Sequence, residues 1–333
     1  MADIASQLIK EFNLKPFQVH NVIKLIDEGN TIPFIARYRK EVTGELNDQI
    51  LRELHERLVY LRNLENRRNE VVRLIDEQGK LTGDIKAAIE KAVTLQEIED
   101  IYRPFKPKRR TRATIAREKG LEPLAEILLA QKLTKGSLEA IVLPFINAEK
   151  DVNTVEDALA GAMDIIAENI SDNAEYRKII RDIFAREGSI VTKAKKEEDS
   201  VYRMYYDFRE PVSKIAKHRI LAIDRGEKEE FIQVKIEVPE EKIINWLKGR
   251  VITNPSSITS KYVEMAAEDA YKRLISPSIE NEVRNDLTQA AHEQAIKVFA
   301  ENLRNLLMQA PVKGKVVLGL DPAYRTGCKL AVV

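Results

Sequence analysis

The sequence YRPFKPKRRTRATIAREKG, residues 102–120, interrupts a chain whose apolar pattern is otherwise mostly helical. Pro104 and Pro107 exclude a helix from its first half, because each proline removes a backbone donor and restrains the residue before it. The second half predicts a short helix that Thr111 caps and that ends before Gly120 in the left-handed conformation. We therefore expect a stiff loop that leads directly into a short helix.

Positive charge is concentrated in this stretch, which we call the basic segment. It contains eight lysine and arginine residues against one glutamate, a net charge of about +7, whereas the whole chain of 333 residues carries +1. Concentrated cations make nucleic-acid phosphate the first partner to consider, RNA or DNA. Tyr102 and Phe105 add possible stacking surfaces. The predicted nucleic-acid-binding residues are Arg103, Lys106, Lys108, Arg109, Arg110 and Arg112.

The same segment has a second interpretation. A basic run is usually a solvated face, or it pairs with acidic side chains of its own protein, and exposed pairs of that kind contribute about 0–1 kcal/mol each. Cations that bind phosphate must stay accessible, whereas structural cations would be held in internal ion pairs. The positions of these side chains therefore decide between the two interpretations.

The amino-acid composition limits the classes of protein to which the chain can belong. The chain has 333 residues, of which 44% are hydrophobic and 32% charged, a profile typical of a mainly helical protein with about two domains. No apolar run approaches the ~18 residues of a membrane span, and no secretory signal is present, so we expect no membrane partner and a cytoplasmic location. The single cysteine, Cys328, excludes a disulfide framework and a cysteine-based zinc site. The four histidines show no metal-ligand spacing, and no cofactor is expected.

Residues 1–45 predict three short helices of helix-turn-helix type. The first covers about residues 4–12, the second starts at Pro16 and ends at Gly29, and the third begins near Pro33. The end of the third helix could contact phosphate through three cations, which are Arg37, Arg39 and Lys40. Two glutamates close by, Glu41 and Glu45, dilute this positive field.

Residues 46–150 predict a long helical hairpin, the basic segment and further short helices. One helix from Asn47 to Gln78 would span roughly 48 Å and needs a helical partner along its apolar stripe. That stripe is formed by Ile50, Leu54, Leu58, Leu61, Val72 and Ile75. The expected partner is an antiparallel pair covering residues 84–93 and 95–102, and Thr94 with Glu97 forms a capping box at the start of the latter.

Residues 151–313 predict a helical central region with a small β element. Helices are expected from Thr154 to Ala167, from a cap at Ser171 to Gly188, over 240–248, from Ser257 or Thr259 to Leu274, and as a second long helix from Ser276 to about Met308. Residues 189–194 and 231–238 read as strands of a possible two-stranded sheet. The stretch 201–219 between them interleaves aromatic and basic residues, which favours either single-strand binding or packing against neighbouring helices.

Residues 314–333 read as the truncated start of an α/β domain. An apolar strand ends at Asp321, a Thr326-Gly327 turn follows, and a second strand begins at Cys328, as at the opening of an RNase H-like fold. In such folds the first-strand carboxylate binds a divalent metal beside acidic residues from later strands. An isolated hairpin is not stable by itself, so we expect the sequence to be a fragment of a longer protein.

Several stretches together resemble the bacterial Tex proteins, a transcription accessory family. They are TIPFIARYRKEVTGEL, FKPKRRTRATIAREKGLEPLA, EDAYKRLISPSIENEVR and GLDPAYRTGCKLAVV. The resemblance implies a helical N-terminal region with a helix-turn-helix element, then a YqgF-type RNase H-like domain, helix-hairpin-helix modules and a C-terminal OB-fold that binds RNA. It also implies a non-enzymatic scaffold that works with RNA polymerase and nucleic acid.

The YqgF motif matches at five positions, which are Gly319, Leu320, Asp321, Thr326 and Gly327. Asp321 is therefore the only candidate catalytic residue, and Mg²⁺ is implied only if a complete RNase H-like domain is active. Ala323 and Tyr324 stand where many relatives have glycine, and this bulkier turn would crowd a phosphate. One aspartate is not a two-metal site, so a structural or vestigial role is favoured.

Three hypotheses for function follow. The first is a non-enzymatic nucleic-acid-binding scaffold in transcription, which rests on the basic segment and the Tex resemblance. The second is a metal-dependent nuclease of the RNase H-like class, which requires further acidic residues beyond Val333. The third is a protein-interaction platform built from the long helices or the aromatic stretch.

Overall fold

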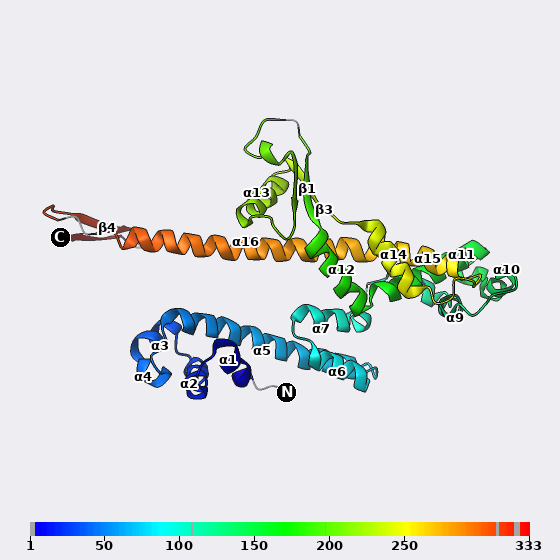
Figure 1. Cartoon of the computed structure of the whole chain (residues 1–333), viewed down its shortest axis with the longest axis horizontal. Helices are drawn as coiled ribbons and strands as arrows, with labels where there is room; N and C mark the ends of the chain where they lie inside the picture. The colour runs from blue at the N-terminus through cyan, green and yellow to red at the C-terminus, as the bar shows by residue number, and fades with distance from the viewer. Residues whose placement is uncertain (1–3, 108, 197, 311–312, 323–326) are drawn as a thin grey trace. The chain divides into compact units, whose positions relative to one another are not determined.

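The computed structural model describes residues 4–107, 109–196, 198–310, 313–322 and 327–333 (Figure 1). The chain forms two compact units, of which the first comprises Met1–Glu187 with Val238–Glu280 and the second Gly188–Glu237 with Asn281–Val333. The mainly helical fold is confirmed, and both β elements are small antiparallel sheets. Within the described ranges, no helix combines the length and the apolar character needed to cross a membrane.

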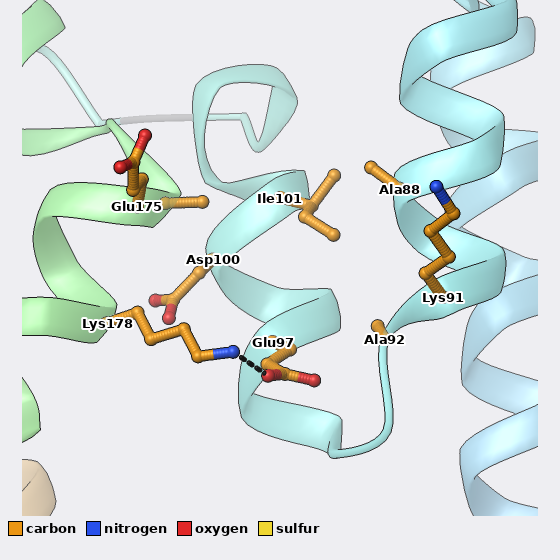
Figure 2. Close-up of a pocket in the computed structure, with 9 residues that line it drawn as sticks. Ala88, Lys91, Ala92, Glu97, Asp100, Ile101, Glu175 and Lys178 are labelled. Atoms are coloured by element: carbon orange, nitrogen blue, oxygen red, sulfur yellow. Dashed lines mark hydrogen bonds and ion pairs between the residues drawn. The ribbon is translucent and has the colours of Figure 1, made fainter.

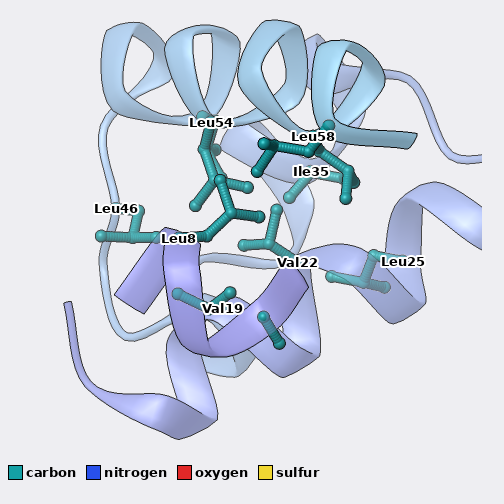
Figure 3. Packing of buried hydrophobic residues seen from close by; sticks show 11 residues of the cluster. Leu8, Val19, Val22, Leu25, Ile35, Leu46, Leu54 and Leu58 are labelled. Atoms are coloured by element: carbon teal, nitrogen blue, oxygen red, sulfur yellow. The ribbon is translucent and has the colours of Figure 1, made fainter. Parts of the chain in front are cut away.

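Four short helices precede a long one in the first unit. They are α1 (Ile4–Phe12), α2 (Pro16–Asp27), α3 (Ile32–Tyr38) and α4 (Lys40–Thr43), and α5 (Asp48–Asp76) follows them. The predicted third helix is thus divided at Arg39 into α3 and α4. Figure 3 shows Leu54 and Leu58 of α5 pointing onto Leu8, Val22 and Ile35, so that the short helices cover the first half of α5.

The long helix α5 starts where the sequence predicts, because the side chain of Asn47 accepts a hydrogen bond from the amide of Ile50. Its second half packs against α6 (Gly83–Lys91) and α7 (Leu95–Tyr102), the predicted antiparallel pair. The predicted stripe holds, although Ile50 and Val72 are half-buried. Its buried residues are Leu51, Leu54, Leu58, Leu61, Leu64, Val71 and Ile75, because two different partners cover the two halves of the helix.

The centre of the first unit is α11 (Val155–Ser171), which packs against α8, α9 and α15. The other elements of this region are η1 (Arg103–Phe105), α8 (Arg112–Glu118), α9 (Glu122–Ala130), α10 (Leu138–Val142), η2 (Leu143–Phe145), η3 (Ala148–Lys150), α12 (Ala174–Glu187), α14 (Glu240–Val251) and α15 (Ser260–Asp269). The predicted cap at Ser171 is wrong: its buried hydroxyl donates to the carbonyl of Glu168 and ends α11. Asn173 caps α12 instead, accepting from the amide of Tyr176 at 3.0 Å.

The second unit contains a three-stranded antiparallel sheet in the order β2-β1-β3, one strand more than predicted. Its strands are β1 (Ser189–Ala194), β2 (Asp207–Pro211) and β3 (Ile232–Glu237), accompanied by η4 (Arg203–Tyr205) and α13 (Lys217–Lys228). The extra strand β2 comes from the aromatic stretch 201–219. Tyr202 and Tyr205 of that stretch are buried, with Tyr202 5.7 Å from the ring of Phe231, so these two rings serve packing.

The second long helix is α16 (Ser276–Leu307), and it continues α15 through a π-helical segment, Ala270–Ile275. The sequence predicts a restart at Ser276-Pro277, but the helix does not break there. The π-helical segment ends just before Pro277, where the amide of Ser276 donates to the carbonyl of Tyr271, five residues back. The strands β4 (Leu318–Pro322) and β5 (Cys328–Val332) form the predicted hairpin, paired antiparallel.

Candidate nucleic-acid interface

The basic segment is fixed at both ends. Tyr102 is buried at the end of α7, and the side-chain amide of Gln78 donates to the carbonyl of Phe105 at 2.9 Å. At the other end Thr111 caps α8, accepting from the amide of Thr114 at 3.0 Å. Gly120 follows α8 with φ of +85°, which only glycine adopts without strain. The predicted cap and the predicted left-handed glycine are both confirmed.

An acidic stripe on α11 and just beyond it underlies the segment. Its members are Asp164, Glu168 and Asp172, four residues apart and therefore on one face of a helix. Arg117 donates to Glu168 at 2.6 Å, and Arg103 donates to Asp172 at 3.2 Å. Glu168 and Asp172 are only 7% and 8% exposed. These contacts dock the segment on α11, so Arg103, predicted to bind nucleic acid, is held in an internal ion pair.

Asp164 at the other end of the stripe has a different partner. Arg273, which belongs to the π-helical segment, lies 2.8 Å from the carboxylate of Asp164. Burial raises the pKa of Asp164, and the positive charges of Arg273 and Arg112 oppose that rise. Arg112 is thus close enough for its field to reach the stripe while its side chain stays exposed.

Four of the predicted cations remain accessible. The side chains of Lys106 and Arg110 are 59% and 71% exposed, and their carboxylate contacts, to Glu99 at 3.8 Å and Glu118 at 3.3 Å, are long. Arg109 and Arg112 are exposed, and among the described residues neither has a carboxylate at ion-pair distance. Lys108 lies outside the described residues. The segment therefore combines both interpretations: some of its cations dock it on α11, and others stay accessible to solvent.

Two hollows flank Pro107, with volumes of about 720 and 260 Å³. Both are lined by Lys106, Glu168 and Asp172, and the larger one also by Lys80 and Phe105. The exposed Lys80, after the end of α5, is a cation that sequence reasoning missed. Only its position beyond the end of the long helix could have suggested it.

A third cavity, of about 280 Å³, lies between α6, α7 and α12 (Figure 2). Its rim carries Lys178, which donates to Glu97 at 2.6 Å. The hydrogen bond from Lys178 holds the pKa of Glu97 below its ordinary value, and the amide of Val93 donates to the same carboxylate. Lys178 and Glu97 are paired with each other, so neither side chain is available to a ligand in this cavity.

Two family models match the sequence. The Tex-like protein N-terminal domain matches residues 2–76, and the Tex central region-like model matches residues 135–299. The chain belongs to the Tex family.

Curated relatives of this Tex chain extend the match. The uncharacterized protein YdcI of Bacillus subtilis is 49% identical over 333 residues, covering 99% of this chain and 46% of the relative. The transcriptional accessory protein Tex of Neisseria gonorrhoeae is 40% identical, covering 99% and 44%. The human S1 RNA-binding domain-containing protein 1 is 30% identical, covering 99% and 34%. The chain thus spans less than half the length of each of these relatives.

The candidate catalytic residue of this Tex chain, Asp321, is exposed on β4 and lies opposite Lys329 of β5. In the parts of the chain that the structure describes, no group of three or more His, Cys, Asp or Glu residues is placed to hold a metal ion. The turn residues Ala323, Tyr324 and Thr326 lie outside those parts.

Proposed function

We propose that this Tex chain is a non-enzymatic, nucleic-acid-binding transcription accessory protein, with RNA as its expected ligand and RNA polymerase as a partner in the cytoplasm. One observation carries the proposal: Lys106, Arg109, Arg110 and Arg112 stay exposed on a segment that is anchored at both ends. The names of the Neisseria and human relatives, which mention transcription and RNA binding, support it.

Fixation of the segment favours binding. The prolines and the docking contacts of Arg103 and Arg117 hold the loop in place before a ligand arrives, so less conformational entropy is lost on association. Exposed guanidinium groups suit phosphate, because their planar donors form paired hydrogen bonds with its oxygens. Glu168 and Asp172 line the hollows beside Pro107, but they are largely buried, and their ion pairs with Arg117 and Arg103 offset their negative charge.

The salt dependence of binding tests the proposal. The triple variant R109A/R110A/R112A removes three exposed cations of the basic segment, and the control K86A/K297A/R304A removes three exposed cations on α6 and α16. Both variants change the net charge equally. We expect the log–log salt slope for a 20-nucleotide RNA, measured by fluorescence anisotropy, to flatten by about 2 in the first variant, because each phosphate contact contributes about 0.7 on single strands. The control should leave the slope unchanged.

Two results would reject this interface. One is an unchanged slope in R109A/R110A/R112A, and the other is an equal change in the two variants, which would indicate a non-specific effect of net charge. Partnership with RNA polymerase is tested separately by pull-down with and without nuclease treatment. Polymerase that is retained after nuclease digestion would indicate a direct protein contact.

A further inference from the structure

We infer that the end of α3, with the following residues, is a second contact surface, at which a single-stranded nucleic acid stacks one base on Tyr38 and places phosphates against Arg37, Arg39 and Lys40. The inference rests on the proposed function, because it takes nucleic acid as the ligand, but it concerns a different surface from the basic segment. We call these four residues and Phe34 the α3 patch.

The α3 patch is exposed and organised by its aromatic rings. Tyr38 is 60% exposed, and its ring centroid lies 5.3 Å from that of Phe34. The guanidinium of Arg37 lies 6.0 Å from the ring of Tyr38, and that of Arg39 lies 5.1 Å from the ring of Phe34. Cation–π contacts of this kind orient both arginines. Nη1 of Arg39 also donates to the carbonyl of Tyr38 at 3.1 Å.

The cations of the α3 patch are available to a ligand. Across the described ranges, no carboxylate lies at ion-pair distance from Arg37, Arg39 or Lys40, whereas most arginines of α5 are paired. Within α3 the anchor is Ile35, which is fully buried in the cluster with Leu54 and Leu58. Burial of Ile35 fixes the helix and leaves the Arg37–Lys40 end in solvent.

The composition of α3 favours a single strand over a duplex. A recognition helix reads the major groove with polar side chains near its N-terminus. The first turn of α3 consists of Ile32, Pro33 and Phe34, which have no side-chain donor or acceptor for a base edge. An exposed tyrosine flanked by arginines instead matches the stacking surfaces that hold unpaired bases.

The net positive charge near the α3 patch is small, because Glu41 and Glu45 lie close to its three cations in the sequence. Stacking is therefore expected to contribute more to affinity here than counterion release. This balance makes the two surfaces separable, because loss of a stacking ring lowers affinity at every salt concentration, whereas loss of a phosphate contact changes the salt slope.

The experiment compares Y38L with Y38F in the full 333-residue chain, using U20, dT20 and a 20-base-pair duplex. F299L serves as the matched control, because Phe299 is 68% exposed on α16. We expect Y38L to weaken binding of U20, dT20 or both by about ten-fold with an unchanged salt slope, and Y38F and F299L to stay within about two-fold of wild type. R37A/R39A should flatten the single-strand slope by about 1.4.

Three results would overturn the inference: Y38L binding within two-fold of wild type on both single strands, Y38F losing as much as Y38L, or duplex binding weakened as much as single-strand binding. Far-ultraviolet circular dichroism and the thermal midpoint verify that Y38L is folded. If R109A/R110A/R112A leaves the slope unchanged while Y38L weakens single-strand binding, the basic segment fails as an interface and the α3 patch stands.

Discussion

Substitution of Asp100 by alanine should destabilise the first unit by about 3–5 kcal/mol, because it removes the counter-charge of a buried arginine. The side chain of Arg177 is fully buried, and that of Asp100 is 4% exposed. Asp100 accepts from Nε of Arg177 at 3.0 Å and from Arg181 at 2.9 Å. The pair joins α7 to α12, so its loss affects the packing of the helix that leads into the basic segment.

Substitution of Arg177 by methionine should destabilise the first unit less than substitution of Asp100 by alanine. R177M removes the buried guanidinium but leaves Asp100 its contact with Arg181. The double variant D100A/R177M leaves neither buried charge of that pair, so we expect it to be more stable than D100A alone. Replacing a buried ion pair by apolar groups is often close to neutral, whereas removing one partner is not.

Urea unfolding followed by tryptophan fluorescence measures these differences. Trp246 is the only tryptophan, and its ring lies 5.7 Å edge-to-face from Tyr176, the residue next to Arg177. With a urea dependence of about 2 kcal/mol per molar, D100A should lower the midpoint by about 2 M. A shift below about 0.5 M, or additive effects in the double variant, would refute the reasoning that the two charges stabilise each other in the core.

Two further predictions concern the first unit. The hydrogen bond from Arg57 holds the pKa of Glu11 below its ordinary value of 4.5. The stability that this ion pair contributes is therefore complete above pH 4.5 and is lost as the pH falls through the lower pKa of the folded state. E11Q should flatten the acid end of the curve of stability against pH measured by circular dichroism, and an unaltered curve would contradict the assignment. G161A should destabilise the folded protein by about 1–3 kcal/mol, because the new Cβ would lie 2.4 Å from Cδ1 of the buried Leu121. G249A in α14 is the control: its Cβ meets no atom within 4 Å, so it should stabilise the folded protein by about 0.5–1 kcal/mol. Thermal unfolding measures both changes.

Local features of the fold were predictable because their causes lie within a few residues. The caps at Asn47, Thr94 and Thr111 each accept a hydrogen bond from an amide three residues ahead, and the sequence shows both members of each pair. The left-handed Gly120 belongs to the same class. Capping and turn chemistry therefore located these helix ends, although the same reasoning failed at Ser171.

Tertiary features were harder to predict. The predicted stripe of α5 holds, but Ile50 and Val72 pack only half-buried against the two clusters, because the helix changes partners halfway along its length. Strand β2 was missed because its residues Asp207–Pro211 alternate weakly and are stabilised by pairing with β1. Ser171 was read as a cap, although the next helix needed the side chain of Asn173 two residues later.

The acidic stripe shows how far charge counting can mislead. Asp164, Glu168 and Asp172 have the spacing of one helical face, and their pairing with the cations of a distant segment could have been suspected but not assigned. A phosphate near the basic segment meets the accessible cations, not the sum of about +7 that the sequence contains. If four cations contact phosphate, the single-strand salt slope is about −2.8, whereas eight would give about −5.6. In the R37A/R39A background, which removes two cations of the α3 patch, a slope near the steeper value would mean that Arg103 and Arg117 leave their carboxylates on binding, so that the ligand rearranges the docked segment.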